Sequence, residues 1–388
     1  MSKIWNIIKP ILVILFVLLI LFALFVIWFI WFGFYDITGL TLYNDEPIAE
    51  IIPCDDRLYF ITEDGKGYIT GGYHLGSTRT YLNSEFHKNE KLGISSPVKF
   101  TDEQIKQLFP FEYGALFITD NNDLYKAIDE RSEYVFGDAI YADYAILDSD
   151  SLIYAINTSN ELYSINEQRE KVFLCNDVKA VKAYRDRIFV LRTNGDLCEL
   201  IKTDSEEYEF SEPLFGNVVD FDVMETSTRH NGEKLIFDDG KAIKTPLFNV
   251  LTESGDLYVK GCYSLLECMI SISAHPDPFE FDEWTLVSEN VKSFDLAPMG
   301  TVFIRNDTSC AYYGFDTETG SDINYKVDYK ELIEEGAISA HTADDVCVYV
   351  KTSDNKYYIW GNWSRLLFDQ NPKNDHNIFT GEPFILEL

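Results

Sequence analysis

The chain begins with a long apolar segment. Between Pro10 and Tyr35 no residue is charged, and residues 11–34 are almost all Ile, Leu, Val, Phe and Trp. A helix of these residues is about 36 Å long at 1.5 Å per residue, which is enough to cross a hydrocarbon core of about 30 Å. A cleaved signal peptide is the alternative, but its apolar region is shorter and ends in small residues, whereas residues 31–35 are bulky. The pattern predicts a transmembrane signal anchor over residues 10–35.

The charges on either side of this segment predict its orientation. Lys3 and Lys9 precede it, whereas Asp36 and Asp45 follow it. Because positive charge stays on the cytoplasmic side, we expect residues 1–9 to be a short cytoplasmic segment and residues 36–388 to form an extracytoplasmic domain. The expected location is the cell membrane, with a single pass through the bilayer.

After the anchor, the hydrophobic pattern changes to short strands joined by polar turns. Residues 250–261 show the unit: an apolar strand, a polar turn closed by Gly255, and a second strand that opens with Leu257 and Tyr258. This pattern is typical of a β-hairpin. It occurs seven times along the chain. The second strand of each copy aligns in a column at Tyr68, Tyr125, Tyr163, Cys198, Tyr258, Ala311 and Tyr358.

The turns of the seven copies share a second column. Glycine and asparagine tolerate positive φ, and only Thr308 departs from these two residue types. The other members of the column are Gly65, Asn122, Asn160, Gly195, Gly255 and Asn355. From residue 68 to residue 358 the six intervals average about 48 residues, and hairpin repeats of this length are typical of β-propellers. The sequence therefore predicts an all-β fold, a seven-bladed β-propeller preceded by one N-terminal transmembrane helix.

A further short apolar strand lies upstream of most hairpins. Examples are residues 178–181 (VKAV) and 291–294 (VKSF), and the last hairpin ends in YIWGN at residues 358–362. Together these motifs resemble the repeat of the regulator of chromosome condensation family, in degenerate copies that mostly lack the Gly-x-x-His of that repeat. The resemblance covers about residues 40–388 and implies a seven-bladed propeller. Guanine-nucleotide exchange, known in that family, is not expected, because its substrate would lie across the membrane.

Several local features complete the predicted architecture. Residues 101–108 carry a capping box followed by Pro110, and residues 329–336 end in a glycine, so both are expected to be short helices. Residues 73–110 and 203–230 are the longest predicted insertions. The apolar alternation of residues 384–388 predicts a strand that pairs into the sheet of the first or last repeat and closes the ring.

The charge of the exterior domain restricts its partners. It contains all 64 Asp and Glu but only 30 of the 32 Lys and Arg, because Lys3 and Lys9 precede the anchor, so its net charge is 30 − 64 = −34. An acidic surface repels phosphate backbones, which excludes nucleic acid as a partner. The charge favours solubility, and a basic ligand or divalent cations are the alternatives. The seven cysteines include no Cys-x-x-Cys, and their odd number leaves at least one thiol unpaired, which we expect to be buried.

No catalytic, metal or cofactor motif stands out. The six histidines share no metal-ligand spacing, and the Asp-rich turns lack the ligand rhythm of a calcium loop. We therefore assign no catalytic residue, no metal and no cofactor. One stretch is locally basic and aromatic in this acidic domain, and it is the candidate ligand-contact loop. Its residues are His74, Arg79, Tyr81, His87 and Lys88.

Two functions fit these features. The first is a non-catalytic binding module that displays loops to an extracytoplasmic protein, peptide or glycan. The second is a cell-surface carbohydrate-active enzyme, a hydrolase or lyase, that uses carboxylates at the propeller channel. The missing catalytic motifs favour the first, and with 64 acidic residues the sequence alone identifies no carboxylate pair.

Overall fold

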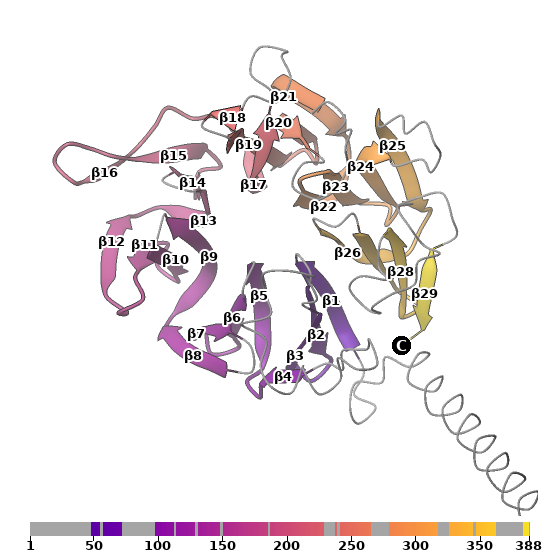
Figure 1. Ribbon diagram of the computed structural model, residues 1–388, viewed down its shortest axis with the longest axis horizontal. Helices are drawn as coiled ribbons and strands as arrows, with labels where there is room; N and C mark the ends of the chain where they lie inside the picture. The colour runs from indigo at the N-terminus through magenta and orange to yellow at the C-terminus, as the bar shows by residue number, and fades with distance from the viewer. Residues whose placement is uncertain are drawn as a thin grey trace, which may run out of the picture.

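Seven small antiparallel sheets are arranged radially around one axis in the computed structural model of the protein (Figure 1). Each sheet is one blade, and the first strand of each blade lies nearest the axis. The structure describes residues 48–54, 57–71, 98–111, 114–128, 131–147, 150–184, 187–228, 237–238, 241–264, 279–316, 326–343, 347–361 and 383–387. The predicted all-β, seven-bladed propeller is thereby confirmed.

The blades follow one another along the chain without exchanging strands. Blade 1 contains β1 (Ile48–Cys54), β2 (Arg57–Thr62), β3 (Gly67–Gly71) and β4 (Val98–Thr101). Blade 2 contains β5 (Ile105–Phe111), β6 (Gly114–Thr119), β7 (Leu124–Ile128) and β8 (Arg131–Phe136). Blade 3 contains β9 (Ala139–Leu147), β10 (Asp150–Asn157), β11 (Leu162–Ile165) and β12 (Lys171–Cys175). Blade 4 contains β13 (Val178–Tyr184), β14 (Arg187–Arg192), β15 (Leu197–Lys202) and β16 (Tyr208–Phe210).

The last three blades keep this plan. Blade 5 contains β17 (Val218–Thr228), β19 (Lys241–Thr252), β20 (Leu257–Tyr263) and β21 (Phe279–Ser288), with β18 (Phe237–Asp238) paired to β19. Blade 6 contains β22 (Val291–Ala297), β23 (Gly300–Arg305), β24 (Cys310–Asp316) and β25 (Lys326–Ile333). Blade 7 contains β26 (Ala337–Ala343), β27 (Cys347–Thr352), β28 (Lys356–Gly361) and β29 (Phe384–Glu387).

The hairpin repeat found in the sequence is the central hairpin of each blade. Every member of its second-strand column faces the equivalent residue of the preceding strand, including the two members that are not tyrosine. Cys198 is opposite Val190, and Ala311 is opposite Phe303. The seven copies of the repeat therefore share one strand register.

The turns of these hairpins adopt positive φ at the predicted column. The seven φ values lie between 61° and 86°, and the column includes Thr308 at 67°. In blades 1 to 6 the carbonyl of this residue accepts a hydrogen bond from the first residue of the next blade, as in Ala139 N to Asn122 O at 2.7 Å and Val218 N to Gly195 O at 2.8 Å. Each of these six turns therefore closes its own hairpin and also holds the adjacent blade.

Apolar side chains fill the spaces between neighbouring blades. Leu124 and Phe136 of blade 2 pack with Ala142 and Ala155 of blade 3, and the other interfaces have similar clusters. Some of these side chains are thiols, since Cys175, Cys198 and Cys310 are buried and unpaired. Burial raises the pKa of Cys175 to about 12. The expected buried free thiol is confirmed.

The alternation of strand directions gives the ring two different faces. The central hairpin turns and the links between blades lie on one side, which we call the turn face. The connections from first to second strand and from third to fourth strand lie on the other side, which we call the loop face. Because β1 is an inner strand, the chain enters the ring at Ile48 on the turn face.

Both predicted short helices are wrong. Residues 101–108 belong to β4, a link and β5, and most of residues 329–336 belong to β25. The capping contact does form, since Thr101 Oγ1 accepts the Glu103 amide at 3.0 Å. However, Ile105 N then donates to Gly65 O at 2.8 Å, so the chain enters the sheet of blade 2 instead of a helix. Tertiary hydrogen bonding overrides the local signal.

The two ends of the chain have different outcomes. The predicted pairing of the C-terminal strand into the last repeat is confirmed, since β29 pairs with β28 and completes blade 7, but the prediction that this strand closes the ring is wrong. The ring is closed where β1 packs against β26 and β27. The predicted anchor, residues 10–35, lies outside the described residues, and among the residues that are described no helix has the length and apolarity required to cross a membrane.

Candidate functional site: an axial belt of charged side chains

Ionisable side chains gather on the inner strands at one register position. In five consecutive blades, blade 3 to blade 7, the residue at this position is charged or is a histidine, and in blades 1 and 2 it is apolar. Each of these residues pairs with the residue at the equivalent position of the second strand of its own blade. We call this set the axial belt, and its members are Ile52, Phe109, Asp143, Lys182, Asp222, Asp295 and His341.

On one side of the axis, His341 joins three blades. Its Nε2 lies 3.0 Å from Glu50 of β1, and its Nδ1 lies 3.6 Å from Asp295 of β22. Asp295 also accepts the Thr342 amide at 2.7 Å. Burial lowers the pKa of His341, but hydrogen bonds to the two carboxylates outweigh it and raise the pKa to about 10. The imidazole is therefore charged at neutral pH.

On the other side, Lys182 is shared among carboxylates of neighbouring blades. Its ammonium lies 3.1 Å from Asp222, and it also interacts electrostatically with Asp143. Burial lowers the pKa of Lys182, but Asp222, Tyr141 and Asp143 together hold it well above its usual value. Asp143 accepts the Ala183 amide at 2.6 Å. These contacts join blades 3, 4 and 5.

Two carboxyl groups in this part of the ring titrate close to neutrality. Burial raises the pKa of Asp143 to about 6, and burial together with the charge of Asp222 raises the pKa of Asp220 to about 6. A carboxyl group with such a pKa can act as a general acid or base. However, Asp143 already accepts an amide of the next blade, and Asp220 accepts the Phe221 amide at 2.9 Å. The contact of Asp143 therefore attaches blade 3 to blade 4, whereas that of Asp220 is local to β17.

The apolar part of the belt is continued by aromatic rings. The ring of Phe109 in β5 lies 5.1 Å from that of Tyr141 in β9, and Phe111 stacks on Tyr144 at 3.9 Å. The ammonium of Lys126 lies 4.7 Å from the centre of the Tyr144 ring. Aromatic packing thus replaces ion pairing between blades 2 and 3.

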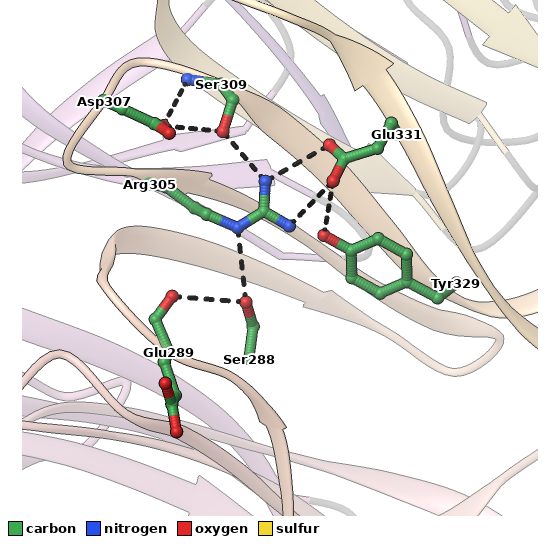
Figure 2. Close-up of polar contacts among 7 residues, drawn as sticks. All are labelled: Ser288, Glu289, Arg305, Asp307, Ser309, Tyr329 and Glu331. Atoms are coloured by element: carbon green, nitrogen blue, oxygen red, sulfur yellow. Dashed lines mark hydrogen bonds and ion pairs between the residues drawn. The ribbon is translucent and has the colours of Figure 1, made fainter.

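A second polar cluster surrounds Arg305 at the end of β23 (Figure 2). Its guanidinium binds both carboxylate oxygens of Glu331, at 3.1 and 3.2 Å, and the Ser309 hydroxyl at 2.8 Å. It also reaches Ser288 of blade 5 at 3.4 Å, and Tyr329 donates to Glu331 at 2.9 Å. In Figure 2 the guanidinium contacts the Glu331 carboxylate and the hydroxyls of Ser288 and Ser309, so this cluster fastens blade 5 to blade 6.

Metal binding has no support in the described part of the chain. Among those residues, no group of three or more His, Cys, Asp or Glu is placed to hold an ion. The candidate loop residues His74, Arg79, Tyr81, His87 and Lys88 lie outside the described residues. The two strand ends that flank them, Gly71 and Val98, lie on the loop face.

The axial belt was missed in the sequence, although a signal was present. The segments VKAV (residues 178–181) and VKSF (residues 291–294), and the equivalent VVDF at residues 218–221, are each followed directly by the belt residue. A charged residue that recurs at the same position of an otherwise apolar strand would have identified the belt. The belt lies on the first strand of each blade, outside the central hairpin that defines the repeat.

Sequence and structure comparisons give different results. No protein-family model matches the sequence, and no curated protein matches it. Among solved structures, human WBSCR16 is similar at 12% identity over 78% of this chain and 86% of that chain, with a TM-score of 0.48. Prp20p from Saccharomyces cerevisiae, described with its binding to Gsp1p and histones, is similar at 11% identity over 74% and 77%, with a TM-score of 0.44.

A third solved structure has another kind of repeat. The WD40 domain of SCAP from fission yeast is similar at 11% identity over 84% of this chain and 98% of that chain, with a TM-score of 0.43. Prp20p is the yeast RCC1, a member of the family whose repeat the sequence resembles. At these identities the likeness concerns the propeller fold alone.

Proposed function

We propose that this chain is a membrane-anchored β-propeller that binds an extracytoplasmic protein, peptide or glycan through its loop face. The observation that carries the proposal is the distribution of connections between the two faces. On the turn face, hairpin turns and links are short and are fixed by hydrogen bonds to adjacent blades. The long connections at residues 72–97, 265–278, 317–325 and 362–382 all begin and end at strand ends on the loop face.

The position of the chain entry supports this orientation. Ile48 begins β1 on the turn face, and the proposed anchor at residues 10–35 precedes it. An anchored ring would therefore be attached to the membrane from its turn face. The loop face, which carries the connection containing His74 and Lys88, would be directed away from the bilayer.

Two experiments test the proposal. Protease added to intact cells should remove the domain after residue 36, and protection until the membrane is permeabilised would contradict the orientation. Proximity labelling from the exterior domain should then identify a partner. The double variant R79E/K88E should lose it, whereas the control K179E/K292E, which makes the same charge change near the turn-face ends of β13 and β22, should retain it. Equal loss in both variants would show that net charge, and not this loop, determines binding.

The carbohydrate-active enzyme remains the second candidate. It is favoured by one observation, the pKa values of about 6 for the carboxyl groups of Asp143 and Asp220 near the axis. If a D143N/D220N variant still cleaves a glycan, by hydrolysis or by elimination, these two carboxyl groups are not the catalytic ones. No turnover of any glycan by the intact chain would argue against this function.

A further inference from the structure

One interface of the ring differs from the other six. Blades 1 to 7 are joined in order by short links, such as residues 102–104 and 137–138, but blade 7 and blade 1 have no such link. Among the described residues, β1 packs there against β26 and β27. We call this interface the seam. Whatever holds the seam must be non-covalent.

The repeat changes its residue types at the seam. In blades 1 to 6 the next-to-last residue of the second strand is a buried Ile or Leu, and in blade 7 it is Lys351. The residue opposite it on the third strand is Gly, Leu or Cys in the first six blades and Tyr357 in the seventh. The seven pairs are Ile61–Gly67, Ile118–Leu124, Ile156–Leu162, Leu191–Leu197, Leu251–Leu257, Ile304–Cys310 and Lys351–Tyr357.

The polar ends of this pair bind the backbone of β1. The Lys351 ammonium donates to Ala49 O at 2.6 Å and to Ile48 O at 3.5 Å. The Tyr357 hydroxyl accepts the Ile51 amide at 3.0 Å and lies 3.3 Å from Ala49 O, to which it can donate. Two side chains thus bind three backbone groups of the first strand, the carbonyls of Ile48 and Ala49 and the amide of Ile51.

Burial makes this pair unusual for a repeat position. Lys351 is 8% exposed and Tyr357 is 1% exposed, so both were removed from water when the ring closed. Well-packed apolar residues are often at least as stabilising as buried charges, and buried polar groups can instead specify one arrangement. When the seam opens, an ammonium and a phenol regain hydration, whereas the Ile and Leu pairs of other interfaces would expose apolar surface.

We propose that Lys351 and Tyr357 form a latch, and that the seam is the point at which the propeller opens. In the open state blade 1 moves as a unit about the link at residues 102–104, and blades 2 to 7 remain folded. The six linked interfaces lack this latch and stay closed. The protein therefore has a built-in conformational transition located beside its first strand.

Hydrogen exchange of the full chain in detergent, followed by mass spectrometry, tests this proposal. In the wild type we expect β1 amides to exchange at least tenfold faster than amides of β13, the inner strand of blade 4. The variants Y357F and K351M should each accelerate β1 further, with β13 unchanged. Two variants are used because a single substitution could itself perturb folding. If the urea concentration at which the β13 amides lose protection is unchanged, the remaining blades are intact.

A matched control is available on the other side of blade 1. The Tyr59 hydroxyl donates to Gly114 O of blade 2 at 2.7 Å, which is again a buried tyrosine bonded to backbone across a blade interface. Because blades 1 and 2 are linked, Y59F should leave the ratio of β1 to β13 exchange unchanged. Equal exchange of β1 and β13 in the wild type, or equal acceleration of β1 in Y59F and Y357F, would overturn the proposal.

Discussion

Thr308 offers a direct test of how the turns hold the propeller together. It is the only β-branched residue in a turn column otherwise occupied by Gly and Asn, and its φ is 67°. A left-handed conformation costs an L-residue about 1–2 kcal/mol, and a β-branched side chain is a clear outlier there. The substitution Thr308→Asn should relieve part of this strain.

The structure also shows what Thr308 contributes. Its carbonyl accepts the Ala337 amide, and its Oγ1 accepts the Gly336 amide at 2.9 Å. Loss of the hydroxyl bond costs about 1 kcal/mol, and glycine costs about 0.5–1 kcal/mol in chain entropy. We therefore expect T308G to be nearly neutral, T308N to stabilise by up to about 1 kcal/mol because asparagine retains a side-chain acceptor, and T308V to destabilise by about 1–2 kcal/mol.

Urea unfolding of the full chain in detergent, followed by tryptophan fluorescence, measures this order. The reciprocal change Gly255→Thr is the control, because a Cβ there would lie 3.2 Å from Val291 O and φ is +84°. It should destabilise by at least about 1–2 kcal/mol. If T308N is no more stable than T308V, backbone strain at this turn is not the governing term and the reasoning is refuted.

Three further predictions concern other parts of the ring. Deletion of residues 381–388 removes β29 from β28 and should destabilise by about 1 kcal/mol per ladder hydrogen bond, measured by urea unfolding; an unchanged midpoint would show that β29 is dispensable. Arg305→Met should destabilise by about 1–2 kcal/mol in the same assay, a value kept low because Glu331 is 55% exposed, and Arg305→Lys should be intermediate. A Met variant as stable as the wild type would show that the Figure 2 cluster does not attach the blades. The third prediction concerns pH. Because Asp143 and Asp220 have folded pKa values of about 6, above their ordinary value of 3.8, stability should rise as pH falls from 7 towards 4. The D143N/D220N variant should show a smaller rise in melting temperature over the same range.

On the other side of the axis, the same pH argument applies with the same sign to His341 and with the opposite sign to Glu50. His341 has a pKa raised to about 10, so its contribution is complete below its ordinary value of 6.5 and is lost as pH rises towards 10. The pKa of Glu50 is lowered from 4.5, chiefly by His341 acting against burial, so its contribution is lost on acidification below that value. Mildly acidic solution should therefore be the range in which the belt contributes most.

The repeat could be predicted from sequence because each blade needs the same local geometry. A turn that requires positive φ selects Gly or Asn, and a paired strand selects alternating apolar residues, so both columns are visible without a structure. Even Cys198 and Ala311 were placed correctly, because the spacing from the turn fixes the register. The predicted helix at residues 101–108 failed because Ile105 finds its hydrogen-bond partner in another blade.

The belt and the latch depend on contacts between blades, so sequence spacing says little about them. Glu50 and His341 are 291 positions apart, yet their side chains lie 3.0 Å from each other. Lys351 could be recognised as a departure from an aliphatic column, but its partners are carbonyl groups of β1, which carry no sequence signature. Only ring closure brings these groups together.

The turns of this propeller restrict how its sequence can lengthen. Since the carbonyl of a turn residue such as Asn122 or Gly195 also holds the first amide of the next blade, an added residue would disturb two blades at once. The long connections, in contrast, begin and end on the loop face, as between β3 and β4. Peptide tags or new recognition loops should therefore be accommodated on the loop face, and the turn face should admit substitution but not insertion.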